Sequence, residues 1–62
     1  MMNMDKHFFK HKFCKLVTDN GFVIYGTVVD IDDTGFFFKT EQTTSYYTWD
    51  NIRSLVPTNG RD

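Results

Sequence analysis

The stretch that decides the fold is FVIYGTVVD, residues 22–30. Its aromatic and β-branched residues favour a strand, yet Gly26 lies in the middle of it. Glycine weakens the interior of a strand unless the chain bends there or another backbone comes close. We therefore expect this strand to curl at Gly26 from one side of a small barrel to the other, with Phe22, Ile24 and Val28 on its core face.

Turn residues divide the rest of the chain into four further short strands. Asn20-Gly21 supplies the positive φ angles that a tight hairpin turn requires, and the stretch Asp32–Gly35 has the composition of a second turn. We assign turn or bend roles to Gly21, Gly26, Asp32 and Gly35. The predicted strands are Phe13–Thr18, Phe22–Asp30, Phe36–Phe38, Ser45–Trp49 and Ile52–Val56, with a 3₁₀ turn at Asp50-Asn51.

The alternation of side chains along a strand sorts the apolar residues into inner and outer faces. Successive side chains point to opposite sides of a sheet, so Phe36 and Phe38 are expected in the core and Phe37 outside. Ile31 fits the same core only if the alternation slips by one residue after Val28, as it does at a β-bulge.

Ahead of the first strand, the segment Met4–Lys12 predicts a short helix. Met4, Phe8 and Phe9 recur with Phe13 at roughly helical spacing. A helix of three turns or fewer is marginal without a surface to lie on. We expect it to cover one open end or face of the barrel.

The predicted fold class is therefore all-β with a short N-terminal helix. The barrel is five-stranded, antiparallel and strongly bent, of the Sm-like or Src-homology-3-like type. We expect a single domain over residues 1–62, with a helix or arm at 1–12, the barrel at 13–57 and a disordered tail at 58–62.

The length and the cysteine content bound the sources of stability. A chain of 62 residues buries only about 60% of its unfolded surface. Its single cysteine, Cys14, cannot form an intramolecular disulfide, so we expect self-association to add stability. No signal peptide and no apolar run of roughly 20 residues is present, which predicts a cytoplasmic protein without membrane contact.

The net charge of −1 hides an uneven distribution. Residues 1–15 carry four lysines against Asp5, a net +3, whereas residues 16–62 carry three basic against seven acidic residues, a net −4. A basic N-terminal segment attracts phosphate, although solvated charge around a chain terminus is the plainer interpretation.

A metal site and a catalytic site both have weak support. On a continuous helix His7, His11 and Cys14 would share one face and could ligate a metal, but the phenylalanines among them indicate packing. We predict no metal and no cofactor. The carboxylates of Asp30, Asp32 and Asp33 are accounted for by turn formation, so we predict no catalytic residue and no enzyme.

The glycine spacing resembles the first motif of the Sm-like proteins, and within them the bacterial RNA chaperone family Hfq. Gly21, Gly26, Val28 and Asp32 match its two glycines, apolar position and aspartate, and Ile52–Pro57 is similar to the end of the Hfq core. Over residues 13–57 the resemblance implies a small barrel, a short N-terminal helix, and edge strands that pair between copies to form rings.

The residues that hold uridine-rich RNA in Hfq are not matched. Hfq has a Tyr-Lys-His run where this sequence has Thr48-Trp49-Asp50, and a Gln-Phe pair where it has Asp33-Thr34. An aspartate repels an approaching phosphate. The resemblance therefore favours the fold and does not carry over the uridine site.

Four aromatic residues are the predicted partner-binding set, because so small a core cannot bury all of them: Phe37, Tyr46, Tyr47 and Trp49. Exposed aromatics either stack on nucleobases or form a protein interface. The acidic residues near them favour protein. We expect a non-enzymatic binding module, for example a regulatory or phage-type accessory protein, that contacts an unknown protein and copies of itself as a homo-oligomer.

The alternative is an Hfq-like RNA-binding protein. It would use the basic N-terminal segment, whose lysines attract phosphate, together with exposed aromatics. Its predicted contact residues are Lys6, Lys10, Lys12 and Lys15.

Overall fold

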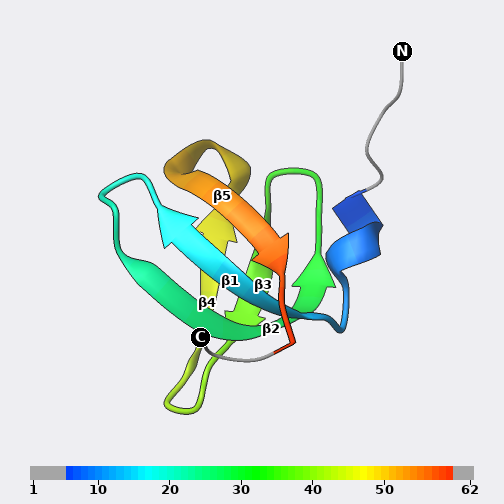
Figure 1. Cartoon of the computed structure of the whole chain (residues 1–62). Coiled ribbons are helices and arrows are strands. Elements are labelled where there is room, and N and C mark those ends of the chain that lie inside the picture. Colours follow the sequence, from blue (N-terminus) through cyan, green and yellow to red (C-terminus); the bar gives the residue numbers. More distant parts are fainter. Residues whose placement is uncertain (1–5, 60–62) are drawn as a thin grey trace.

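A computed structural model describes residues 6–59 as one five-stranded antiparallel sheet (Figure 1). The strand order across the sheet is β4-β3-β2-β1-β5, so consecutive strands pair except that β5 returns to lie beside β1. The elements are η1 (Lys6–Phe9), β1 (Phe13–Thr18), β2 (Val23–Ile31), β3 (Gly35–Lys39), β4 (Thr44–Thr48), η2 (Trp49–Asn51) and β5 (Ile52–Pro57).

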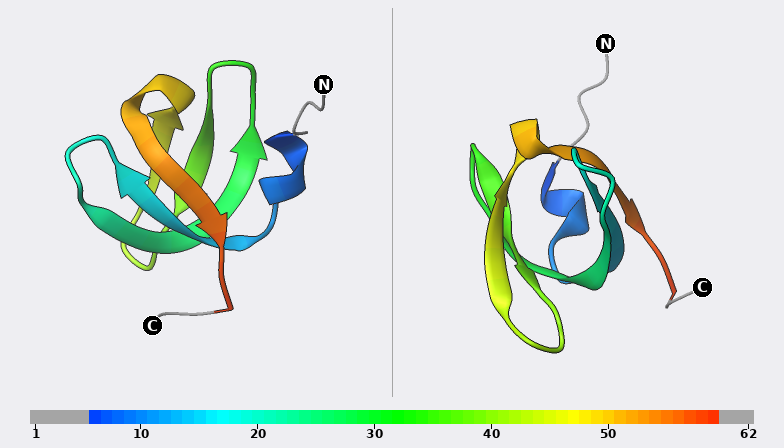
Figure 2. Two further views of the ribbon diagram at one scale, coloured as in Figure 1. Left: turned by 45° about the horizontal axis from the view of Figure 1, so that its top comes forward. Right: turned by 90° about the vertical axis from the view of Figure 1, so that its left-hand side faces the viewer.

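Strand β2 is the long central strand that the sheet curves around (Figure 2). Gly26 lies in its middle and is buried. A Cβ atom at this position would collide with the backbone carbonyl oxygen of Lys39 and would lie 3.0 Å from a ring carbon of Phe38. The glycine is therefore required for the close approach of β3, in agreement with the predicted role of this residue.

The predicted β-bulge is confirmed. The register of β2 against β3 shifts between Val28 and Asp30, and Ile31 then pairs with Phe36. Both Val28 and Ile31 are buried in the core. The bulge thus moves Ile31 to the inner face, which strict alternation from Val28 would not allow.

The core occupies the inner face of the curved sheet. Phe36 and Phe38 are fully buried there, whereas Phe37 is 42% exposed on the outer face, as the alternation predicts. The other buried residues are Phe9, Cys14, Leu16, Val28 and Ile31, and Ile24, Tyr47, Trp49, Ile52 and Leu55 pack against them.

The predicted closed barrel is not what the structure contains. Within residues 6–59, no hydrogen-bonded pairing joins β4 to β5, so the strongly curved sheet keeps two edges. β4 uses one side of its backbone on β3, and β5 uses one side on β1. Side chains of Trp49 and Ile52, at the corner between the two strands, pack on the core in place of a closing ladder.

The predicted helix over Met4–Lys12 is also replaced by a shorter element. Only Lys6–Phe9 is helical, as a 3₁₀ turn, and His11 has φ 68°, which takes the chain out of the helical region. The His11 amide then donates to the Val28 carbonyl (2.6 Å). Phe9 enters the core, so one ring and this backbone bond attach the segment where a longer helix was expected. Met4 itself lies outside the described residues.

Several boundaries differ by one residue from the predicted ones, and one core residue was wrong. Phe22 was expected inside with Ile24 and Val28, but it precedes β2 and is 66% exposed. Its backbone carbonyl accepts the Thr18 amide across the hairpin turn (2.9 Å), where Gly21 has φ +91°. At the other end of the chain, the Thr58 amide donates to the Phe13 carbonyl (2.9 Å), which extends the pairing of β5 with β1.

Candidate functional site

The outer face of β3 and β4 carries an exposed pair of aromatic rings. Phe37 and Tyr46 are directly opposite one another, with ring centroids 4.9 Å apart. They are 42% and 39% exposed. We call Phe37 and Tyr46 the acidic-side aromatic pair, because Asp30 lies opposite Phe37 on β2 and Asp32 contacts Tyr46.

Asp32 organises the β2–β3 turn and connects it to β4. One carboxylate oxygen, Oδ1, accepts from the backbone amides of Thr34 (3.0 Å) and Gly35 (2.9 Å). The same atom accepts from the hydroxyl groups of Thr34 (3.2 Å) and Tyr46 (2.8 Å). This agrees with the turn role predicted for Asp32 and shows a link to Tyr46 that sequence spacing could not indicate.

These hydrogen bonds shift the acidities of both side chains. The Tyr46 hydroxyl, followed by the Gly35 amide and Thr34, stabilises the charged carboxylate and lowers the pKa of Asp32. The pKa of Tyr46 is raised: the hydrogen bond with Thr34 opposes the rise, but the Asp32 carboxylate and partial desolvation outweigh it. The phenol is therefore held protonated as a donor to Asp32, which fixes the ring beside Phe37.

The predicted set of four aromatic residues is divided between the two faces. Tyr47 and Trp49 pack against the core, and the Trp49 ring lies 4.8 Å from that of Phe36. The Trp49 indole also donates to the Asp32 carbonyl (3.4 Å). The exposed partner surface is therefore narrower than predicted and is limited, within this set, to Phe37 and Tyr46.

The free edge of β4 lies next to this aromatic pair. The Thr40 amide donates to the Thr43 carbonyl, and the Trp49 amide donates to the Thr34 carbonyl. Because hydrogen-bonded and non-hydrogen-bonded pairs alternate in an antiparallel ladder, the backbone groups of Ser45 and Tyr47 point toward β3. Those of Thr44, Tyr46 and Thr48 point away from the sheet and are available to a further strand.

The edge of β5 is less open to pairing. The Thr58 amide donates to the Phe13 carbonyl, and Cys14 and Pro57 are opposite one another in the register. By the same alternation the backbone of Pro57 points away from β1, together with that of Leu55. Proline has no amide hydrogen, so this edge offers donors only in its earlier part.

The predicted basic segment does not form one patch. Lys10 forms an ion pair with Asp30 (3.6 Å), and the Lys12 ammonium lies 5.0 Å from the centroid of the Phe8 ring. Lys15 is exposed on β1, directly opposite Tyr25. The side chain of Lys6 is outside the described part of the structure.

The three residues considered for a metal site are also not brought together as ligands. Cys14 is fully buried in the core, whereas His11 is exposed, and the 3₁₀ turn ends before either of them. Burial raises the pKa of the Cys14 thiol, against the opposing effect of the Lys12 charge. Among the side chains that the structure describes, no cluster of three or more potential metal ligands occurs.

The helical elements at positions 6–59 are two short 3₁₀ turns, and neither is long or apolar enough to cross a membrane. Comparison of the sequence with models of protein families gives no match, and comparison with curated proteins gives none either.

Proposed function

We propose that this protein is a small non-enzymatic binding module of Sm-like type that acts through protein contacts, including contacts with copies of itself. The observation that carries the proposal is the acidic-side aromatic pair, exposed immediately beside the free edge of β4. Aromatic residues are enriched where proteins bind one another, and an unpaired edge strand is a template for another chain.

The acidic residues near this pair favour protein over nucleic acid as its partner. Asp30 is opposite Phe37 across β2 and β3, and Asp32 accepts the Tyr46 hydroxyl. Two carboxylates this close to the rings repel phosphate groups. A peptide strand brings backbone amides and apolar side chains, which suit the outward carbonyl groups of β4 and the two rings.

The two edges also suggest how copies would assemble. β4 of one copy and β5 of the next are different surfaces, so pairing between them is head-to-tail and closes into a ring if the rotation permits. The resemblance to Sm-like proteins supports this ring, with the curved sheet as a barrel completed by neighbouring copies. Pairing of β4 with β4 would instead give a two-fold dimer.

The test blocks the β4 edge without altering its pairing with β3. Thr48 has φ −92° and ψ 149°, close to the geometry of proline, and its amide points away from β3. Thr48→Pro therefore removes one outward donor. We expect Thr48→Pro to lower the mass measured by light scattering toward that of the monomer, while the control Thr48→Val, which keeps the amide, retains the mass of the parent chain.

The measured mass also distinguishes the modes of assembly. A mass of several copies supports the ring, and a mass of two copies supports pairing of β4 with β4. A parent chain that is monomeric at all concentrations, or a Thr48→Pro variant that assembles like Thr48→Val, contradicts self-association through this edge.

A further inference from the structure

A second aromatic pair lies elsewhere on the outer face of the sheet, and its surroundings are basic. Phe13 on β1 and Tyr25 on β2 stack with ring centroids 6.4 Å apart and planes inclined by 20°. Cys14 and Gly26, their neighbours in sequence, are buried on the inner face. Side chains alternate along a strand, so both rings lie on the outer face, where they are partly exposed.

The strand registers place two lysines beside this stack. Lys15 is directly opposite Tyr25 on the neighbouring strand. Phe13 is opposite Thr27, and Thr27 is opposite Lys39, which puts these three residues in one row across β1, β2 and β3. The diagonal stack of Phe13 on Tyr25 is therefore bordered by Lys15 on one side and by Lys39 across the next strand.

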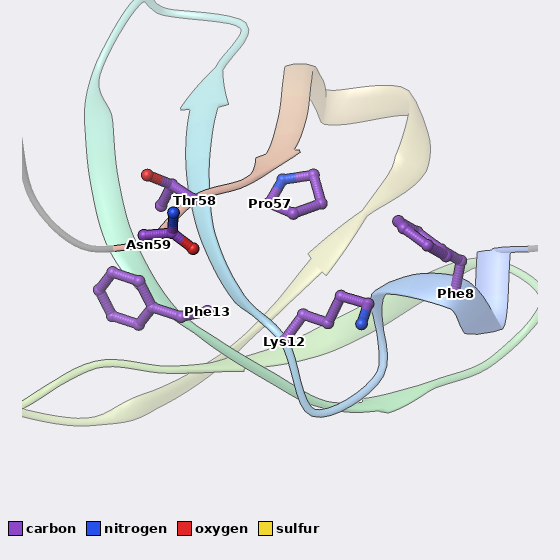
Figure 3. A pocket seen from close by; sticks show the side chains of 6 residues that line it. All are labelled: Phe8, Lys12, Phe13, Pro57, Thr58 and Asn59. Atoms are coloured by element: carbon purple, nitrogen blue, oxygen red, sulfur yellow. The ribbon is translucent and has the colours of Figure 1, made fainter.

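A third lysine borders the stack where the chain enters β1. A hollow of about 410 Å³ is lined by Phe8, Lys12 and Phe13, with Pro57, Thr58 and Asn59 on its other side (Figure 3). The Lys12 ammonium lies over the Phe8 ring, 5.0 Å from its centroid. Phe13 is thus shared between the stack with Tyr25 and a hollow that holds a further ring and a cation.

The same phenylalanine also borders a second hollow on the other side. This hollow, of about 700 Å³, is lined by Phe13 and Tyr25 and reaches Lys39. Glu41 lines it too, so the surface has three lysines and one carboxylate. This balance is the reverse of the one around Phe37 and Tyr46.

We propose that the surface formed by Phe13, Tyr25, Lys12, Lys15 and Lys39 binds single-stranded nucleic acid. Unstacked bases stack on aromatic rings with little dependence on sequence, and neighbouring cations hold the phosphates. Rings and lysines alternate here across adjacent strands, which matches the alternation of bases and phosphates along a strand of nucleic acid. A duplex keeps its bases stacked inside and offers only phosphates to this surface.

This surface is separate from the β4 edge, so the two proposals can fail independently. Assembly is measured by light scattering, whereas binding to this face is measured as the fluorescence anisotropy of a labelled oligonucleotide. The probes are oligouridylate and oligothymidylate of about 15 nucleotides, with a duplex of the same length and polyglutamate as competitors.

The expected binding is sensitive to salt in a defined way. Three lysine–phosphate contacts on a single strand predict a slope of about −2 in a plot of log affinity against log salt concentration. Affinity should therefore fall roughly 20-fold between about 50 and 200 mM salt. Lys12→Gln, Lys15→Gln and Lys39→Gln should each make the slope shallower by about 0.7.

Matched controls separate this surface from general charge and general aromatic effects. Arg53→Gln removes the same charge near Asp19, whose carbonyl it contacts, and should leave affinity close to that of the parent chain. Tyr25→Leu should weaken binding by about 5-fold or more, whereas Phe37→Leu should not. Thermal unfolding of each variant checks that it folds, and the three lysine variants carry the test if Tyr25→Leu does not.

The proposal is overturned if neither oligonucleotide binds at about 50 mM salt. It is equally overturned if Arg53→Gln weakens binding as much as Lys15→Gln, or if Phe37→Leu weakens it as much as Tyr25→Leu. Displacement by polyglutamate as effective as by unlabelled oligonucleotide assigns the surface to acidic protein segments instead. Preference for RNA or for DNA among the two probes identifies which nucleic acid it takes.

Discussion

Asp32 shows how one side chain can stabilise a turn and a neighbouring strand together. Its Oδ1 atom accepts two backbone amides and two hydroxyl groups, one of them from Tyr46 on β4. All four donors favour the ionised carboxylate. The turn and the exposed aromatic ring therefore depend on the charge of this one residue.

This dependence predicts a loss of stability in acid. The pKa of Asp32 is lowered in the folded protein, so its contribution is complete above the unfolded pKa of about 3.9. That contribution is lost as the pH falls through the lower, folded value, because the unfolded chain then binds more protons. We expect the temperature of unfolding to fall with pH in this range less steeply in Asp32→Asn than in the parent chain.

The matched control is the adjacent turn carboxylate, changed as Asp33→Asn. Its unfolding temperature should retain the acid dependence of the parent chain. Calorimetry or circular dichroism across the acidic range measures all three proteins, and equal acid dependence in Asp32→Asn and Asp33→Asn would falsify the role given to Asp32.

At the scale of elements, η1 and the residues after it act as a plug for one end of the core. Phe9 is 9% exposed and belongs to the core cluster, whereas its neighbour Phe8 is 56% exposed. The His11 amide donates to the Val28 carbonyl, and the Val28 amide donates to the Lys12 carbonyl. A four-residue 3₁₀ turn has little stability of its own, so burial of Phe9 and these two bonds hold it in place.

Truncating the two neighbouring phenylalanines should therefore have unequal effects. Phe9→Ala removes a buried ring and leaves a cavity, at a cost of about 3 kcal/mol in the free energy of unfolding. Phe8→Ala removes an exposed ring and should cost under about 1 kcal/mol. Urea unfolding of both variants measures the difference, and equal losses would show that η1 does not close the core.

At the scale of the whole molecule, the chain has a thin core and two unpaired strand edges. A chain of 62 residues is marginal alone, and the sheet from β4 to β5 is not closed by hydrogen bonds within residues 6–59. Pairing of edges between copies would bury both apolar surface and backbone groups. Stability and assembly are then coupled through mass action.

Self-association through the β4 edge predicts that stability depends on protein concentration. The unfolding temperature of the parent chain and of Thr48→Val should rise as the concentration is raised, because only the folded state assembles. Thr48→Pro should show a smaller rise. Differential scanning calorimetry over a wide concentration range measures this, and an unfolding temperature of the parent chain that is constant across the range counts against assembly.

The sequence by itself determined the features that arise from neighbouring residues. The five strands, the turn at Gly21, the bend at Gly26 and the bulge after Val28 follow from glycine geometry and from the period of the side chains. The exposure of Phe37 between two buried phenylalanines follows in the same way. These features depend on local conformational preferences, which a sequence records directly.

Only the tertiary structure decided which distant residues share a surface. It separated Tyr47 and Trp49 from the exposed pair, and it joined Tyr25 to Lys39, which the predicted set of N-terminal lysines did not include. It also left β4 and β5 as open edges. These outcomes depend on the register between strands far apart in the sequence, and register is set by the packing of the whole core.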